Sequence, residues 1–306
     1  MIVLDKVLTI KSPKRIIFRG ALTKIGELVN WSAIEEELKK MYSGIGRPSH
    51  PPLMLFKMIL LQHLYQLSDP QTKEIVNDRY SFRTFIGLPW GEAVPDETTL
   101  VRFRQRLLEH GLHDKLLTLV NQEIAAKGFE LKKGVIVDST LVRSASRQDE
   151  EAKSMPNRKK QEHHGYKAHV CTDAQEALVV KVEVSSANVH DIKMFEEVLP
   201  EEHGEIYADK AYDKMQQRKK LGERCKILYR GRRNRKLTEE QLEFNREASR
   251  VRARVEKIFG HWKRVMEFAV VRYIGLKKMR LDTELKAVCW NLKRLVNLVK
   301  EAKVKA

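Results

Sequence analysis

The chain has 306 residues, a length that fits one large domain or two ordinary domains of about 150 residues each. Hydrophobic residues make up 42% of the chain and charged residues 32%, which is enough apolar material for a core and excludes wholesale disorder. Lysine and arginine number 58 against 41 acidic residues, and the net charge of +17 favours nucleic acid as a partner, with a merely basic enzyme as the alternative.

Cysteine usage and hydropathy indicate the compartment. The three cysteines lie far apart and form no close pair, so a disulfide scaffold is not expected and a reducing cytoplasm is. The longest apolar stretch, residues 53–67, is interrupted by polar side chains and is shorter than the roughly 20 residues of a membrane span. We therefore expect a cytoplasmic protein with no membrane partner.

Helix signals run through most of residues 30–128. Pro51-Pro52 opens an apolar run that predicts a buried helix, and Asp96 is a suitable N-cap for a helix that Gly111 would end. This second helix carries arginines at alternate positions: Arg102, Arg104 and Arg106. Such a set suits a helix-turn-helix DNA reader, but a plain helical bundle with solvated arginines fits equally well. Residues 1–128 are predicted to form an all-helical, DNA-binding or dimerisation domain.

The pattern changes after Gly128. Short apolar runs predict five strands, which cover residues 134–137, 166–172, 177–185, 205–208 and 226–229. The polar stretch 146–164 is predicted to be a loop, helices separate the later strands, and long helices complete the chain. Residues 129–306 are thus expected to form an α/β domain with a mixed five-stranded sheet covered by helices.

Two aspartates each end a predicted strand. Asp138 follows Val135-Ile136-Val137, and Asp209 follows Ile206-Tyr207-Ala208. A single aspartate at such a place is more often a turn or cap residue. Two on neighbouring strands favour a bound cation, because burying a carboxylate is costly without compensation.

A third acid lies on a predicted helix near the C-terminus. Arg252, Glu256 and Lys263 stand at i, i+4 and i+11, which places a cation, an acid and a cation along one helix face at about 100° per residue. A solvated face with ordinary i,i+4 ion pairs is the alternative explanation.

These motifs together resemble those of bacterial DDE insertion-sequence transposases, in the group numbered five and its relatives in the group numbered four. The family signature of arginine, then glutamate after three residues, then lysine after six more is present without a gap as Arg252, Glu256 and Lys263. GVIVDST and IYADKAYD resemble the segments around the two family aspartates, here Asp138 and Asp209. Further matching stretches extend the resemblance over residues 46–295, namely GRPSHPPLMLFKMILLQHLYQLSD, VPDETTLVRFRQ, SANVHD and GHWKRVMEFAVVRYIGL.

The resemblance implies a ribonuclease-H-like catalytic domain whose catalytic and metal-binding acids are Asp138, Asp209 and Glu256. It implies two Mg²⁺ ions per site, with Mn²⁺ as a substitute, bridged by Asp138 and held singly by the other two acids. Arg252 and Lys263 would bind phosphate near the cleaved bond. The substrates would be the terminal inverted repeats of the element and target double-stranded DNA, paired by a homodimer or larger assembly.

The chain departs from the family pattern at two positions. Ser249 stands where a tyrosine often precedes the signature, and Ala211 stands where a glycine commonly precedes the tyrosine after the second aspartate. Neither position carries a carboxylate, so the expected metal chemistry is unaffected. The tyrosine's contact with the transposon end is expected to be lost or supplied elsewhere.

A run of basic residues precedes the catalytic helix. Five cations fall within seven positions, namely Arg230, Arg232, Arg233, Arg235 and Lys236. They are expected to bind DNA phosphate, with a solvated loop as the alternative.

Two other functions stay open beside the transposase. One is a catalytically inactive DNA-binding regulator derived from a transposase, and the other is a nuclease of the same fold without strand transfer. Retention of all three acids in matching contexts favours the enzyme.

Overall fold

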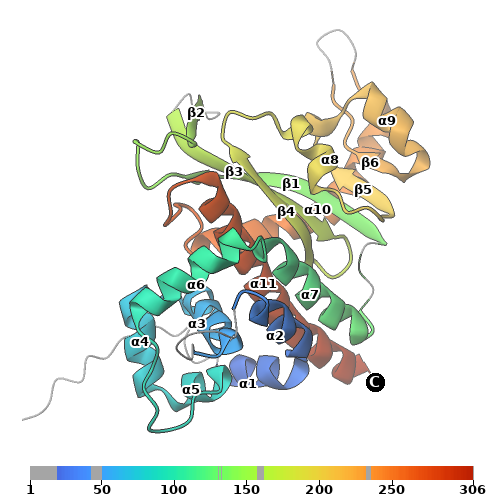
Figure 1. The fold of residues 1–306 in the computed structure, drawn as a ribbon. Helices are drawn as coiled ribbons and strands as arrows, with labels where there is room; N and C mark the ends of the chain where they lie inside the picture. The colour runs from blue at the N-terminus through green and yellow to red at the C-terminus, as the bar shows by residue number, and fades with distance from the viewer. Residues whose placement is uncertain are drawn as a thin grey trace, which may run out of the picture.

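The fold is that of a computed structural model, which describes residues 19–42, 50–129, 131, 133–156, 162–231 and 236–305. The described chain begins with seven helices that gather on one side of the molecule (Figure 1). They are α1 (Arg19–Leu28), α2 (Ser32–Lys39), α3 (Pro52–Tyr65), α4 (Asp69–Asp78), α5 (Tyr80–Ile86), α6 (Glu97–Glu109) and α7 (His113–Ala126).

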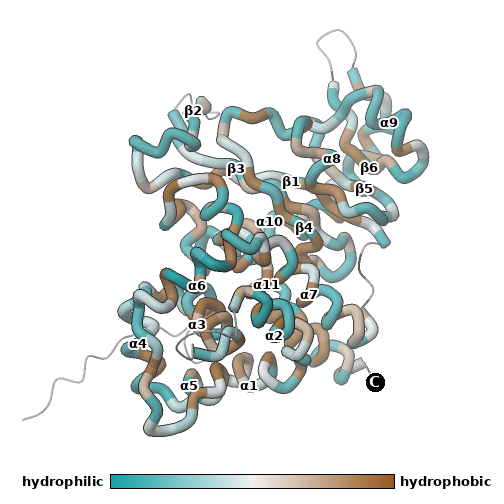
Figure 2. The backbone as a smooth tube through the Cα atoms, in the orientation of Figure 1, coloured by the Kyte–Doolittle hydropathy of each residue, from teal (hydrophilic) through white to brown (hydrophobic). Residues whose placement is uncertain are grey.

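Helix α3 is the centre of this group, as its apolar run predicted. Its side chains are buried on nearly all sides, and α2, α4, α5 and α6 pack around it (Figure 2). The predicted cap of α6 is confirmed, because the Asp96 side chain accepts a hydrogen bond from the Thr99 backbone N–H at 2.7 Å. Gly111 follows with a φ of 60°, a conformation that suits glycine after a helix.

A six-stranded mixed sheet forms the other side of the molecule. Its strands are β1 (Gly134–Arg143), β2 (Lys153–Pro156), β3 (Glu162–Asp173), β4 (Val179–Ser186), β5 (Glu205–Ala208) and β6 (Cys225–Ile227). β3 pairs antiparallel with β1, β2 and β4, whereas β5 runs parallel to β1 and β6 parallel to β5. The main path of the sheet is β2-β3-β1-β5-β6, and β4 pairs with β3 beside this path.

The strand β2 corrects the expectation of five strands and a loop over residues 146–164. It is mostly exposed and is held by pairing with the start of β3, from Lys153 opposite Gly165 to Pro156 opposite Glu162. Backbone pairing without burial leaves no hydropathy signal, which is why the polar sequence indicated a loop.

The later helices cover both faces of the sheet. They comprise the short elements η2 (Asp191–Lys193), α8 (Phe195–Val198), η3 (Lys210–Tyr212), α9 (Met215–Leu221) and η4 (Gly222–Arg224), and the long helices α10 (Glu239–Val265) and α11 (Leu276–Lys305). Val255 of α10 packs on Ile136 at one face, and Phe195 of α8 packs with Val137 at the other. Both faces of β1 are therefore buried over its first four residues.

Helix α11 joins the sheet to the first helices. It packs against α1, α3 and α7 as well as β4 (Figure 1). Asn291 of α11 accepts a hydrogen bond from the Val179 N–H at 2.8 Å and donates one to Asn121 of α7 at 2.7 Å. The predicted boundary between residues 128 and 129 falls between α7 and β1, yet the chain returns to the helical side at its end, so this division stays a prediction.

None of the helices in the described ranges is long and apolar enough to cross a membrane.

Candidate active site

Asp138 and Asp209 lie side by side at one edge of the parallel strand pair. Val137 on β1 pairs with Ala208 on β5, and each aspartate is the next residue of its strand. β5 ends there, and Asp209 precedes η3. β1 instead continues to Arg143, because its second half pairs antiparallel with β3. Asp138 is therefore a mid-strand residue, which corrects its predicted place at a strand end.

Arg252 of α10 lies between the two carboxylates. Its Nη2 donates to Oδ2 of Asp138 at 2.7 Å, and its Nη1 is 3.7 Å from Oδ1 of Asp209. The other oxygen of Asp138 accepts a hydrogen bond from the Ser139 N–H at 2.8 Å. All three charged side chains are less than one-third exposed, so the attraction is screened less than it would be in water.

The surroundings of Asp138 act on its ionisation in two opposite directions. Burial raises the pKa of Asp138 above its ordinary value, and the negative charge of Asp209 adds to that effect. Arg252 and the Ser139 N–H act in the opposite direction, because both stabilise the ionised carboxylate. Two carboxylates on adjacent strands are thus held close together and share one positive charge.

Glu256 and Lys263 lie further along α10, one turn and about three turns beyond Arg252. Both are exposed at the margin of the buried face, which includes Val255 and Trp262. Within the described part of the chain, no three His, Cys, Asp or Glu residues are grouped closely enough to hold a metal ion. The structure therefore brings Asp138, Asp209 and Arg252 together, but it does not place Glu256 in the same group.

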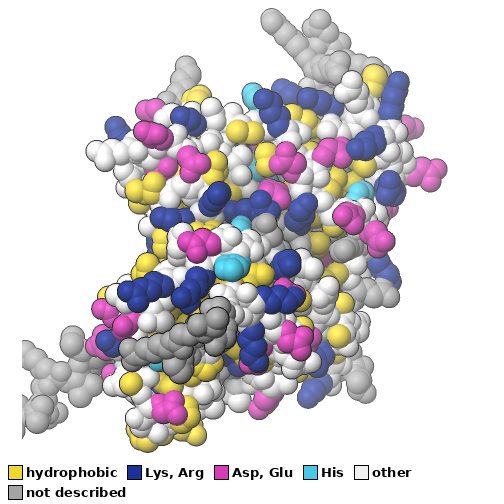
Figure 3. Space-filling view, viewed as in Figure 1, with side chains coloured by type: hydrophobic (Ala, Val, Ile, Leu, Met, Phe, Trp, Pro, Cys, Tyr) yellow, Lys and Arg dark blue, Asp and Glu magenta, His cyan; other side chains and the backbone are white. Residues whose placement is uncertain are grey.

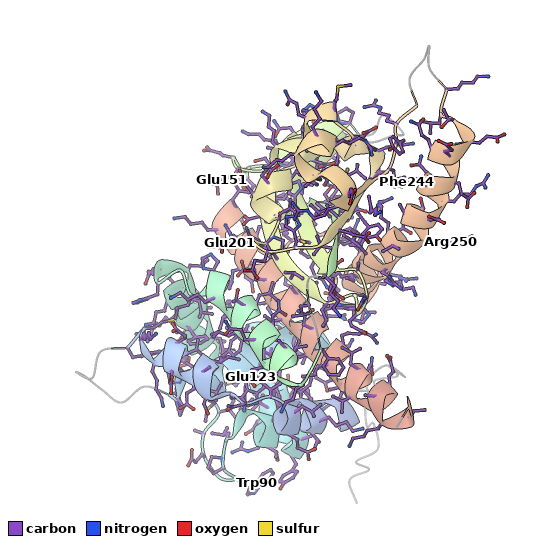
Figure 4. All side chains as sticks on the ribbon, turned by 90° about the vertical axis from the view of Figure 1, so that its right-hand side faces the viewer. Trp90, Glu123, Glu151, Glu201, Phe244 and Arg250 are labelled. Atoms are coloured by element: carbon purple, nitrogen blue, oxygen red, sulfur yellow. The ribbon has the colours of Figure 1, made fainter. Side chains whose placement is uncertain are left out.

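The basic run before α10 is described only in part. Arg230 and Lys236 are exposed, and the Arg230 backbone N–H donates to Asp213 at 2.8 Å. Arg232, Arg233 and Arg235 lie outside the described residues. Figure 4 shows the first half of α10, marked by the labelled Phe244 and Arg250, extending along the outer side of the sheet domain.

The three arginines of α6 do not share one surface. Arg102 is exposed, and Arg106 lies over the Tyr42 ring at 4.6 Å. Arg104 is only 8% exposed, and its guanidinium binds both carboxylate oxygens of Asp69, at 2.5 and 2.8 Å, as well as Gln62. Its predicted DNA contact is therefore corrected, because this side chain holds α6 to α3 and α4.

Sequence reasoning missed a buried polar cluster behind β1. Its buried members are Lys167 and His169 of β3, Ser185 of β4 and Tyr212 of η3, and the partly exposed Asp191 of η2 lies at its edge. The signal for it was present: Lys and His alternate with apolar residues in YKAHV, a strand that is otherwise buried. The SANVHD segment contributes Asp191.

The order and directions of the strands, with β4, β3 and β1 antiparallel and β5 and β6 added in parallel, define a ribonuclease-H-like fold. Two family models match the chain: residues 13–106 match a transposase domain (DUF772), and residues 130–292 match the transposase DDE domain. The second match covers more than half of the chain, which therefore belongs to the DDE transposase family.

A solved structure is also similar to the chain. It is described as a cryo-EM structure of a piggyBac transposase synaptic complex with hairpin DNA. Its TM-score is 0.48 at 10% sequence identity, over 96% of this chain and 77% of that one.

Proposed function

We propose that this chain is a bacterial insertion-sequence transposase of the group numbered five. It binds the terminal inverted repeats of its element, cleaves DNA at the element ends and joins the freed 3′-hydroxyl to target DNA. The observation that carries this proposal is the convergence of Asp138 and Asp209 on one shared cation, the Arg252 guanidinium.

The donor set fits a hard divalent cation. Two carboxylates are held next to each other, and a guanidinium already serves as their shared positive charge. Oxygen ligands of this kind suit Mg²⁺, with Mn²⁺ as a substitute. We propose that Asp138, Asp209 and Glu256 hold the metal ions of the two-metal site. When bound, these ions supply Lewis acidity and lower the pKa of an attacking water or 3′-hydroxyl.

Arg252 has a second role in this proposal. A guanidinium binds phosphate as readily as carboxylate, through charge-assisted hydrogen bonds. When Asp138 and Asp209 take up another cation, Arg252 is released and can bind a phosphate beside the cleaved bond. Glu256 lies one helical turn away on the same side of α10, and Lys263 extends this stripe along the DNA.

DNA is held mainly by positive charge. The chain carries a net charge of +17, and Figure 3 shows lysine and arginine side chains spread over the visible face with acids between them. We assign phosphate contacts to exposed or partly exposed residues, namely Arg102, Arg106, Arg230, Lys236 and Lys263. Arg232, Arg233 and Arg235 are proposed on the sequence alone. Pairing of two element ends requires at least a dimer.

Cleavage of labelled DNA that carries the element's own terminal repeats tests this function. Wild type and Asp209→Ala are compared in Mg²⁺ and in EDTA. Metal-dependent cleavage at the repeat boundary by wild type alone, followed by joined products with target DNA, is the expected result. Binding by both proteins with cleavage by neither would favour an inactive regulator, and cleavage without joining would favour a nuclease.

A further inference from the structure

An ion pair between a buried lysine, Lys167, and a partly buried aspartate, Asp191, lies next to the strand that carries Asp138. Lys167 is only 5% exposed, and its Nζ lies 2.8 Å from Oδ1 of Asp191 and donates to the Val189 carbonyl oxygen at 2.7 Å. Neither residue belongs to the proposed metal site. Burying a lysine costs free energy unless its charge is paired, and an apolar pair would serve stability equally well. The pair therefore calls for an explanation other than stability.

Lys167, the first member of this pair, is held next to β1 by backbone pairing. Lys167 stands opposite Leu141 in the antiparallel ladder of β1 and β3, and the same ladder places Asp138 opposite Val170. The lysine and the first catalytic aspartate are thus set by one register. Backbone pairing leaves Lys167 little freedom to move relative to Asp138.

The other member of the pair, Asp191, is connected to Asp209 through packed side chains. Asp191 begins η2, which packs against η3, and Phe195 shortly after it has its ring centroid 5.4 Å from that of Tyr212. Both rings are almost completely buried. The Tyr212 N–H donates to the carbonyl oxygen of Asp209 at 2.9 Å. An unbroken series of contacts therefore runs from Lys167 to the second aspartate.

Asp209 needs such support because the sheet does not hold it. The last pair of the β1–β5 ladder is Val137 with Ala208, one residue before the aspartate. Beyond that point its backbone is set by η3, a single short turn. A displacement of η3 would move the Asp209 carboxylate away from Asp138, even with β5 in place.

We propose that the Lys167–Asp191 ion pair is a positioning device that holds Asp209 beside Asp138, acting through Phe195 and Tyr212. Its effect on catalysis rests on the function proposed above, whereas its effect on the position of the Asp209 segment does not. The Lys167 ammonium is oriented by its hydrogen bond to the Val189 carbonyl oxygen as well as by the charge of Asp191, and a pair of apolar side chains would supply neither constraint.

The test replaces the pair without leaving a buried charge. Lys167→Met/Asp191→Asn removes both charges at nearly constant volume. The matched control is Lys220→Met/Glu196→Gln, which makes the same kind of change at an exposed pair of 2.7 Å between α9 and α8. Hydrogen exchange of the peptide 205–214, thermal melting, DNA affinity and the single-turnover cleavage rate at saturating DNA are measured for each protein.

In the Lys167→Met/Asp191→Asn protein, exchange in residues 205–214 is expected to be faster by about tenfold, with little change in melting temperature. Cleavage is expected to slow by about tenfold or more at unchanged DNA affinity, because small displacements of reacting groups are costly. The control protein should match wild type. A folded Lys167→Met/Asp191→Asn protein with wild-type exchange and cleavage would overturn the proposal.

A second variant covers the case in which the double variant does not fold. Phe195→Leu keeps the ion pair and an apolar side chain in the core, and it removes the ring that contacts Tyr212. It should also speed exchange in residues 205–214, and unchanged exchange there would overturn the proposal. If wild type cleaves no DNA, the proposed function fails, while the exchange data still decide whether the pair holds the Asp209 segment.

Discussion

Arg252 donates to Oδ2 of Asp138 at 2.7 Å, and the same guanidinium reaches Oδ1 of Asp209 at 3.7 Å. The single positive charge of Arg252 is therefore shared between both aspartates of the proposed active site. We expect a second cation that binds Oδ2 of Asp138 and Oδ1 of Asp209 to compete with Arg252, so that binding of metal and release of Arg252 are coupled. DNA phosphate, as an alternative partner for the guanidinium, would favour the same release.

Replacement of this arginine should strengthen metal binding in the absence of DNA. In Arg252→Gln the two carboxylates keep their geometry and lose the competing cation. Mn²⁺ affinity of the DNA-free protein, measured by electron paramagnetic resonance, is expected to rise about tenfold, or ~1.4 kcal/mol, the size of one charge-assisted hydrogen bond. Cleavage of DNA should fall, because a phosphate contact is lost.

Arg250→Gln is the control for this experiment, since Arg250 is exposed on the same helix two residues earlier. Its Mn²⁺ affinity should equal that of wild type. Weaker or unchanged Mn²⁺ binding by Arg252→Gln would show that the guanidinium does not compete for this site.

Some of the site could be predicted from the sequence because its signals are local. Apolar runs followed by aspartate place Asp138 on a strand and Asp209 directly after one, and helical spacing puts Arg252 and Glu256 on one face. The ion pair between Arg252 and Asp138 joins residues 114 positions apart, and only the packing of α10 on β1 creates it. The resemblance indicated a phosphate ligand, whereas the structure shows a carboxylate partner.

Other features have no local signal at all. The strand β2 is exposed and exists only through its pairing with β3. Arg104 alternates with Arg102 and Arg106 along one helix, and the sequence does not distinguish it from them. It is buried because it pairs with Asp69 of another helix. Nothing in the sequence around Lys167 or Asp191 indicates that they pair, because only the positions of β3 and η2 in the fold bring them together.

The arginines of α6 are expected to respond differently to substitution. Arg104→Ala removes one partner of a largely buried pair and leaves Asp69 without its counter-ion, so unfolding free energy should fall by about 3 kcal/mol. Arg102→Ala changes an exposed side chain and should alter stability by no more than about 0.5 kcal/mol. Urea unfolding of both proteins measures these values.

DNA binding completes this comparison. Arg102→Ala should weaken affinity equally for all sequences and reduce the salt dependence by about one phosphate contact. Titrations at several salt concentrations test this. Unchanged affinity and salt dependence in Arg102→Ala would show that Arg102 does not contact DNA. Wild-type stability in Arg104→Ala would show that the pair with Asp69 does not stabilise the fold.

His169 should make stability depend on pH. It is completely buried, and burial lowers its pKa from the ordinary 6.5 to about 4, with Lys167 adding to the decrease and Asp191 opposing it. Between these two values the unfolded chain binds a proton that the folded protein does not. The stabilisation is therefore complete above pH 6.5 and is lost as the pH falls towards 4, by about 3 kcal/mol in total.

His169→Gln removes this contribution. The difference in unfolding free energy between wild type and His169→Gln should shrink by about 3 kcal/mol from pH 7 to pH 4, as measured by urea unfolding. His190→Gln changes an exposed histidine and serves as the control. A constant difference across this range would mean that His169 takes up a proton equally well in the folded protein.

Gly165 stands where β1, β2 and β3 meet, opposite both Arg143 and Lys153. A Cβ at this position would clash with the Val142 carbonyl oxygen, and it would lie 2.8 Å from the Ser144 nitrogen. These are backbone atoms of the neighbouring strand, so β3 must move away from β1. Gly165→Ala is expected to lower unfolding free energy by about 2–3 kcal/mol.

The same displacement would move Lys167, two residues later on β3, relative to Asp138. Exchange in residues 205–214 should therefore rise in Gly165→Ala, as is expected when the Lys167–Asp191 pair is removed. Gly26→Ala is the control, because nothing lies within 4 Å of its added Cβ and alanine favours helix α1 by about 0.5–1 kcal/mol. If Gly165→Ala is as stable as wild type, β1 and β3 do not approach as closely as described. If Gly165→Ala is destabilised but its exchange in residues 205–214 equals that of wild type, β3 does not influence the position of Asp209.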